Sequence, residues 1–390
     1  MTTPLPQVRL DQFARRIPLI PRSHLVYPTF TARIDEVANC AEKSTQDRPL
    51  PERINLACAA WNLSALVASD CGLPDLARDL CLRQLRIFQT ALPLTGDTAI
   101  AGLQPIINLV RLTARAEDPQ TAYHQLMSVR RALHQGGSFT IHGHPFHSAG
   151  FATEATLEHI QPWLHSLLLD DGTRLLAASG QWNRAAQHAT VYDEAPARLH
   201  TSRQAAVIAN LHTTGDPVTV HSLLDRATIT EPWERAVEKI LRHYADHRTN
   251  RATPEGFATA ARAVQDALEP GPPNLRMFRV RLALAAISLM PKDHEAWGQP
   301  LYNAIVSDTV GSGDAHAARE ILRQPVDLAS KWSDRELRAT VRSGHLGQGA
   351  LPEPVLSTLE QAARTAGASL IHCLSQKGAT SPPLRQARVN

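Results

Sequence analysis

Three histidines lie close together in the segment HQGGSFTIHGHPFHSAGF, at positions 142, 144 and 147. Neutral imidazoles are common ligands of zinc and related metals. On a strand, His142 and His144 share a face, and His147 can approach them from the turn after Pro145. This spacing predicts a metal site formed by His142, His144 and His147. The competing interpretation is a solvated loop, which the sequence favours because 18 histidines are spread along the chain.

Two adjacent carboxylates, Asp170 and Asp171, are a second candidate for chemistry. Neighbouring residues on an α-helix diverge by about 100°, so the pair does not converge on one ion without a loop geometry. Together with the three histidines, used as metal ligands or as acid and base groups, they would be the best residues for an enzyme on a helical scaffold.

Motifs of the common enzyme classes are missing from the sequence. It contains no GxxxxGK[ST] phosphate loop, no HExxH metal motif and no GxSxG nucleophile elbow. We therefore expect no cofactor and favour a non-enzymatic function. The question of catalysis stays open, because helical enzymes need not carry any of these motifs.

The composition predicts an all-α protein. The chain has 390 residues, of which 43% are hydrophobic and only 5% aromatic. It is rich in the helix formers Ala, Leu, Arg and Gln, and strand-length runs of Val, Ile, Thr and Tyr are scarce. This length suits two or three domains or one extended repeat array.

Charge and cysteine content restrict the partners and the compartment. A net charge of +3 and a pI near 8.7 are mild for a chain of this size and disfavour a dedicated nucleic-acid binder. The five cysteines form no CxxC pair, which indicates a reducing compartment. No apolar run approaches the roughly 20 residues that span a bilayer. We expect a cytoplasmic protein without membrane contact, and the oligomeric state stays open.

A helix-turn-helix pattern recurs along the chain. In each copy a helix ends, a polar turn follows, and a small residue five positions after the turn residue begins the packing of the next helix. The turn residue and the small residue are Gly72 and Ala77, Glu117 and Ala122, Gly180 and Ala185, Gly215 and Val220, and Gly313 and Ala318. The pattern predicts a series of helical hairpins.

The first hairpin resembles a tetratricopeptide repeat, because Trp61, Gly72 and Ala77 stand where that family has its tryptophan, its turn and its alanine. Later copies keep the turn but not the regular interval. The resemblance implies an α-solenoid whose first helices line a concave groove. The residues that it places in the groove are Asn62, Ser69, Arg111, Arg115, Arg174, His212 and Asn303.

Arg111 and Arg174 fall on the same repeat position, six residues before the turn. Two guanidiniums in one groove would offer donor forks to a carboxylate or a phosphate. The competing interpretation, favoured by the arginine-rich background, is that they are solvated or paired with Asp and Glu.

The predicted division of the chain is linear. Residues 1–50 form a proline-rich irregular arm, 51–268 the TPR-like repeats, 269–375 a C-terminal set of helical repeats and 376–390 a disordered tail. A small irregular or β-hairpin insertion is expected near residues 134–151.

These features predict a non-enzymatic helical-repeat scaffold or sensor that binds a peptide, a protein partner or a small anionic ligand in its groove. The first alternative is an enzyme that uses the histidine-rich insertion. The second is a regulator that contacts nucleic acid through its basic ends, which ranks last because neither end resembles a helix-turn-helix reader.

Overall fold

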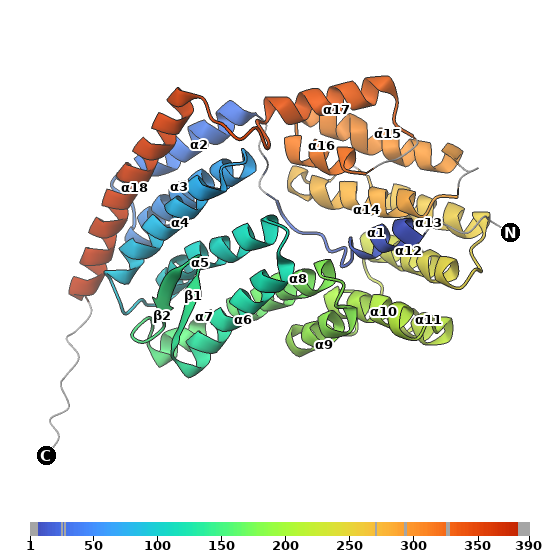
Figure 1. The fold of residues 1–390 in the computed structure, drawn as a ribbon, viewed down its shortest axis with the longest axis horizontal. Helices are drawn as coiled ribbons and strands as arrows, with labels where there is room; N and C mark the ends of the chain where they lie inside the picture. The colour runs from blue at the N-terminus through green and yellow to red at the C-terminus, as the bar shows by residue number, and fades with distance from the viewer. Residues whose placement is uncertain are drawn as a thin grey trace, which may run out of the picture. The chain divides into compact units, whose positions relative to one another are not determined.

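The computed structural model of the chain divides into two compact units, each built from separate stretches of sequence (Figure 1). Unit 1 comprises Met1–Thr29 and His165–Leu346, and unit 2 comprises Phe30–Leu164 and Gly347–Asn390. The structure describes residues 7–24, 26, 29–269, 271–291, 295–324 and 328–380. These residues are mostly helical, which confirms the predicted all-α class at that level. No helix among them is long and apolar enough to cross a membrane.

Unit 2 is a set of helices with one small hairpin. Its elements are α2 (Phe30–Lys43), α3 (Leu50–Asp70), α4 (Pro74–Gln89), α5 (Asp97–Arg115), α6 (Pro119–Gln135), β1 (Ser138–Ile141), β2 (His144–His147), most of α7 (Glu154–Leu167) and α18 (Glu353–Thr380). The C-terminal helix α18 packs against α2, α3 and α4. The segment before it is fixed by two backbone bonds, from Gly347 N to Asp70 O and from Gly349 N to Cys71 O, each 2.8 Å long.

The hairpin predicted near residues 134–151 is present. Strands β1 and β2 are antiparallel, with Ile141 opposite His144 and Ser138 opposite His147. The two turn residues, His142 and Gly143, both have positive φ (47° and 79°), as a tight two-residue hairpin turn requires.

Unit 1 contains the remaining helices. They are α1 (Gln7–Ala14), the π-helical turn η1 (Leu168–Gly172), α8 (Thr173–Ala178), α9 (Trp182–Tyr192), α10 (Thr201–Thr213), α11 (Pro217–Asp225), α12 (Pro232–Arg248), α13 (Pro254–Ala267), the short 3₁₀ helix η2 (Pro273–Leu275), α14 (Arg276–Ser288), α15 (Glu295–Ser312), α16 (Ala315–Leu322) and α17 (Lys331–Ser343). Helix α14 is buried along most of its length, because its neighbours cover it on several sides.

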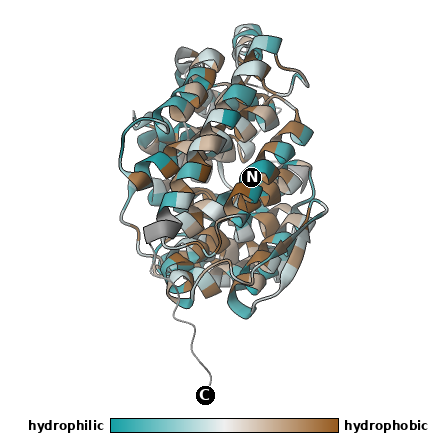
Figure 2. Cartoon of the chain, turned by 90° about the vertical axis from the view of Figure 1, so that its left-hand side faces the viewer, coloured by the Kyte–Doolittle hydropathy of each residue, from teal (hydrophilic) through white to brown (hydrophobic). Residues whose placement is uncertain are grey.

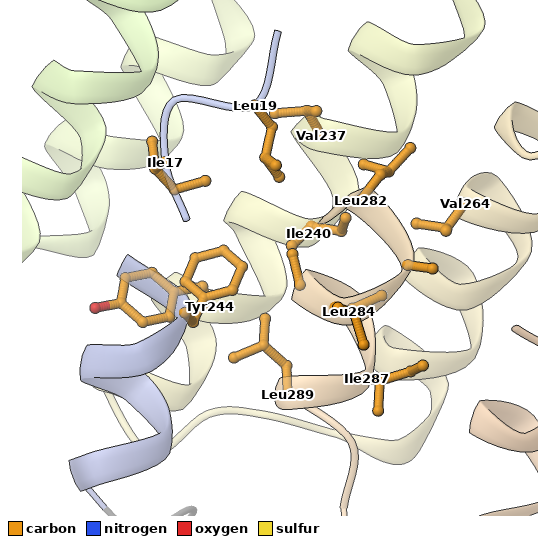
Figure 3. Close-up of a cluster of buried hydrophobic side chains, with 14 of the residues drawn as sticks. Ile17, Leu19, Val237, Ile240, Tyr244, Val264, Leu282, Leu284, Ile287 and Leu289 are labelled. Atoms are coloured by element: carbon orange, nitrogen blue, oxygen red, sulfur yellow. The ribbon is translucent and has the colours of Figure 1, made fainter. Parts of the chain in front are cut away.

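The core of unit 1 joins the N-terminal segment to the later helices (Figure 3). The ring of Phe13 stacks on that of Tyr244 with centroids 4.4 Å apart, and both side chains are fully buried. Ile17 and Leu19 are each 2% exposed and lie near Ile240 and Val237. Burial of apolar area on this scale is the main stabilising contribution to such a unit. Most helices carry both hydrophobic and hydrophilic residues, as amphipathic packing requires (Figure 2).

The predicted helical hairpins are confirmed at all five turns. Their turn residues have φ values of 84°, 63°, 71°, 63° and 69° in the order of the chain. The small residues five positions later, from Ala77 to Ala318, are each 0% exposed. A left-handed residue ends each first helix, and the buried small residue lets the second helix approach it.

The compact units differ from the predicted linear division. Residues 1–50 are not one irregular arm: α1 and α2 lie within them, and the first 29 residues pack with unit 1. Helix α2 can form because no proline stands between Phe30 and Lys43. In the predicted tail, residues 376–380 continue α18, and residues 381–390 lie outside the described part of the chain.

Candidate functional site

The three histidines of the predicted metal site do not come together. His142 lies in the hairpin turn rather than on a strand, and its Nε2 is 3.0 Å from the Leu109 carbonyl oxygen and 3.1 Å from Thr113 Oγ1. His144 and His147 are three positions apart on β2, so they lie on opposite faces. Within the described residues no three His, Cys, Asp or Glu side chains are grouped so that they could hold a metal ion.

Part of the predicted groove set lies in unit 2, where Asn62, Ser69 and Arg115 form hydrogen bonds. Asn62 Oδ1 accepts a hydrogen bond of 3.0 Å from Asn108 Nδ2. Arg115 donates to Ser69 Oγ at 2.6 Å and pairs with the buried carboxylate of Asp70 at 3.0 Å. Arg111 is exposed. The pairing of Arg115 agrees with the competing interpretation, in which the arginines bind Asp or Glu side chains.

The remaining members of the set, Arg174, His212 and Asn303, belong to unit 1. His212 stacks on Trp182, and its Nε2 is 3.3 Å from Tyr244 Oη. Burial, followed by the charge of Arg248, lowers its pKa. Asn303 is exposed and accepts a bond of 2.9 Å from Gln299 on its own helix. Of this set, Arg174 alone lies in a concentration of charge.

That concentration of charge is organised by a π-helical turn. Helices α7 and α8 are joined without a break by η1, which carries Asp170 and Asp171. His188, buried on α9, donates from Nε2 to the Leu168 carbonyl at 2.8 Å. Gly172 is fully buried beneath this imidazole ring. The hydrogen bond from His188 therefore stabilises the π turn, and such turns are frequent at functional sites.

Four arginines of unit 1 interact with this turn or with one another, and we call them the guanidinium cluster: Arg16, Arg22, Arg174 and Arg281. Arg22 pairs with Asp170, and its buried Nε has no hydrogen-bond partner in the described structure. Arg16 and Arg281 share Glu320, at 3.4 and 3.6 Å. The charge of Arg281 acts on each of the other three arginines, so these side chains form one electrostatic group.

Arg174 is the least compensated member of the cluster. Among the described residues it has no hydrogen bond or ion pair within ordinary distance. Burial lowers its pKa to about 10, and the charges of Arg22 and Arg281 contribute against the opposing charges of Asp171 and Asp170. The same three arginines, after burial, lower the pKa of His24. Burial is the main cause of both shifts, and the neighbouring arginine charges add to it, so the position favours a negative group.

A second group of arginines in unit 1 shows the contrasting situation. Arg276 and Arg279 line a pocket of about 400 Å³ between α13, α14 and α15. Arg276 binds both carboxylate oxygens of Asp308, at 3.0 and 3.3 Å, and is 3.6 Å from Asp314. Arg279 donates to Asp308 at 3.3 Å and to the Pro272 carbonyl at 3.1 Å. These guanidiniums are already neutralised.

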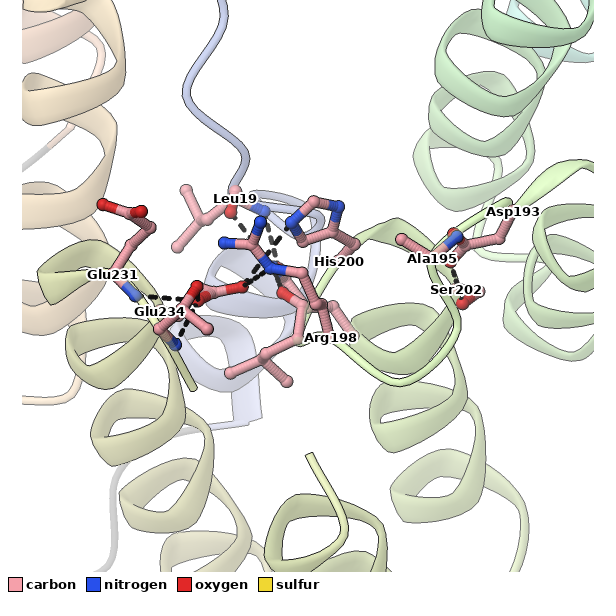
Figure 4. A network of polar contacts seen from close by, with 11 residues as sticks. Leu19, Asp193, Ala195, Arg198, His200, Ser202, Glu231 and Glu234 are labelled. Atoms are coloured by element: carbon pink, nitrogen blue, oxygen red, sulfur yellow. Dashed lines mark hydrogen bonds and ion pairs between the residues drawn. The ribbon is translucent and has the colours of Figure 1, made fainter. Parts of the chain in front are cut away.

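A third polar network surrounds Glu234, whose carboxylate binds donors of the fold itself (Figure 4). Arg198 Nε, Thr230 N and Glu231 N donate to the Glu234 carboxylate at 2.9, 2.8 and 3.0 Å. Burial raises the pKa of this carboxyl, but the donors outweigh burial and lower it to about 2. Glu234 closes the N-terminus of α12 and joins it to the loop that carries Arg198.

Sequence reasoning found Arg174 but missed Arg16, Arg22, His24 and Arg281. The N-terminal segment was expected to be an irregular arm, and Arg281 lies in the range expected to form C-terminal helical repeats. One signal was present: RMFRVRLALAAISLM places arginines within an almost entirely apolar helix, and a half-buried arginine needs a counter-charge.

Comparison with known proteins adds no name to this description. No protein-family model matches the chain, and no match was found among curated proteins or solved structures.

Proposed function

We propose that this chain is a non-enzymatic helical scaffold that binds an anionic group, a carboxylate or a phosphate, at the guanidinium cluster of unit 1. The observation that carries the proposal is Arg174, a half-buried guanidinium in a positive local potential, which has no ion pair among the described residues. A planar guanidinium in such a place can give two parallel hydrogen bonds to an anion. A bound anion would neutralise the half-buried positive charge of Arg174.

The series of helical hairpins supports the scaffold part of the proposal. Five turns with the same backbone conformation and the same buried small residue resemble tetratricopeptide hairpins. Proteins built from stacked hairpins commonly bind peptides, proteins or small ligands. We propose the same use for this chain, with the anionic group belonging to a free small molecule or to an acidic partner.

Isothermal titration with pyrophosphate, at constant low ionic strength, tests the proposal. We expect the natural chain to bind and Arg174→Gln to bind at least about tenfold more weakly, because a hydrogen bond to a charged group contributes roughly 1.5–3 kcal/mol. Arg335→Gln is the matched control, since Arg335 is 71% exposed and pairs only with its neighbour Glu336 in the described structure. It should bind like the natural chain.

Circular dichroism must show the same helical content in all three proteins. The proposal fails if the natural chain does not bind pyrophosphate at millimolar concentrations. It also fails if Arg174→Gln binds as tightly as Arg335→Gln.

A further inference from the structure

The proposed anion site already contains an anion of its own, the carboxylate of Asp170. This group pairs with Arg22, so a ligand that approaches the guanidinium cluster must compete with it. We infer that Asp170 is an internal competitor: it occupies the ligand's place on Arg22, and a bound anion displaces it and takes over Arg22. The inference rests on the proposed function and adds an autoinhibitory contact to the site.

The position of Arg22 does not depend on its bond to Asp170. Leu19 stands three residues before Arg22. Its backbone N donates a hydrogen bond of 2.7 Å to the buried side chain of Gln204, and its carbonyl accepts one of 3.0 Å from the same side chain. Two residues later, His24 N donates to the Asn274 carbonyl at 2.8 Å. The backbone is thus anchored on both sides of Arg22, and the guanidinium stays beside the cluster when it changes partner.

Asp170 is poorly placed as a permanent partner. Its side chain is 34% exposed, and burial of the rest raises its pKa despite the opposing charges of Arg22 and Arg174. Arg22 also keeps a buried Nε that Asp170 does not satisfy and that has no other partner in the described residues. A pair of this kind contributes little net stability, so its exchange for a ligand is inexpensive in free energy.

The charge balance gives the direction of the effect. The four guanidiniums face three carboxylates, those of Asp170, Asp171 and Glu320, which leaves one positive charge in excess. Replacing Asp170 by asparagine keeps the shape of the side chain and raises the excess to two. An anion at the cluster is then held by one more unopposed guanidinium.

Titration of Asp170→Asn with pyrophosphate tests the inference. We expect affinity to rise about tenfold over the natural chain, a moderate value because the site is partly exposed to solvent. The double variant Arg22→Gln, Asp170→Asn should lose this gain and bind like Arg22→Gln alone, because the gain acts through Arg22. Asp334→Asn is the charge-matched control: Asp334 pairs with Arg338 at 2.7 Å on α17 and belongs to no cluster contact described above. It should leave affinity unchanged.

The outcomes separate this inference from the proposed function. If Asp170→Asn binds no more tightly than the natural chain while Arg174→Gln binds more weakly, the autoinhibitory contact is refuted and the anion site stands. If the natural chain binds and Asp170→Asn binds more tightly, both are supported. If neither Asp170→Asn nor the natural chain binds, both are refuted. A gain that persists in the double variant also refutes the competition for Arg22.

Discussion

The close contact between Gly172 in the π turn and the ring of His188 predicts that the Gly172→Ala variant, which adds one methyl group, is destabilised. A Cβ atom added at Gly172 would lie 2.2 Å from His188 Nε2 and 2.9 Å from Cε1. Neither distance is possible, and the imidazole is 8% exposed, so the ring must be displaced within a packed interior. Gly172→Ala therefore breaks the bond from His188 to the Leu168 carbonyl.

The cost follows from two contributions. A buried carbonyl that loses its donor costs roughly 1–3 kcal/mol, and overpacking of a core typically costs about 1–3 kcal/mol more. The helix propensity of alanine returns about 1 kcal/mol. We expect Gly172→Ala to lower the free energy of unfolding by about 1–5 kcal/mol.

Urea titration monitored by circular dichroism measures this change. Gly311→Ala is the control, because Gly311 also lies in a helix and a Cβ there meets nothing within 4 Å. That variant should gain roughly 0.5–1 kcal/mol. Combining Gly172→Ala with His188→Ala removes the clash, so the double variant should lose at least about 1 kcal/mol less than the sum of the single variants. The reasoning is refuted if Gly172→Ala is as harmless as Gly311→Ala.

Two further predictions concern buried charge. Burial, then the neighbouring His247, lowers the pKa of His243 to about 3, so the unfolded chain takes up a proton below pH 6.5 that the folded chain does not. This histidine should remove about 2.3 kcal/mol of stability between pH 6.5 and 4.5. Urea midpoints should fall less steeply in His243→Leu, and equal slopes would contradict the assignment. In unit 2, Arg33 and Arg115 both bind Asp70, but Arg33 is 3% exposed and Arg115 is 47% exposed. Arg33→Gln should lower the free energy of unfolding by about 3–5 kcal/mol and Arg115→Gln by under about 1 kcal/mol. Similar losses for the two variants in urea titration would show that burial does not determine the contribution of each ion pair.

The helical hairpins could be predicted because their signals are local. A turn residue and a small residue five positions later report only the geometry of two successive helices, and this geometry is the same wherever the hairpin packs. Glu117 illustrates the strength of the register: it adopts a φ of 63° although it is not glycine. Asn250 and His345 also have positive φ, 56° and 55°, and neither was among the predicted turns.

The stretches of sequence that make up each unit could not be predicted, because their packing depends on contacts between residues distant in sequence. The bonds from Leu19 to Gln204 and from Gly347 to Asp70 join segments separated by 185 and 277 residues. Periodicity identifies an apolar face but not the face that covers it. The linear division of the chain differed from the compact units for this reason.

The guanidinium cluster shows why residue type alone could not locate the site. Arg276, Arg279 and Arg174 are alike in sequence, all of them arginines near or within helices rich in leucine and alanine. Arg276 and Arg279 form ion pairs with Asp308, whereas Arg174 lies among two other arginines and has no carboxylate within ion-pair distance in the described part of the chain. What distinguishes them is whether the fold brings a carboxylate into direct contact.

At the cluster, the carboxylates are placed by a local irregularity that sequence reasoning did not foresee. On a regular α-helix Asp170 and Asp171 diverge, and the expectation that they could not act on one charge was sound for that geometry. The π turn changes the helical phase at this point, and both carboxylates now act on Arg22 and Arg174. Gly172 and His188 hold the π turn in its conformation. The conformation of this turn and the affinity of the site for an anion should therefore be coupled. A variant that restores a regular α-helical turn should therefore alter pyrophosphate binding without touching any arginine.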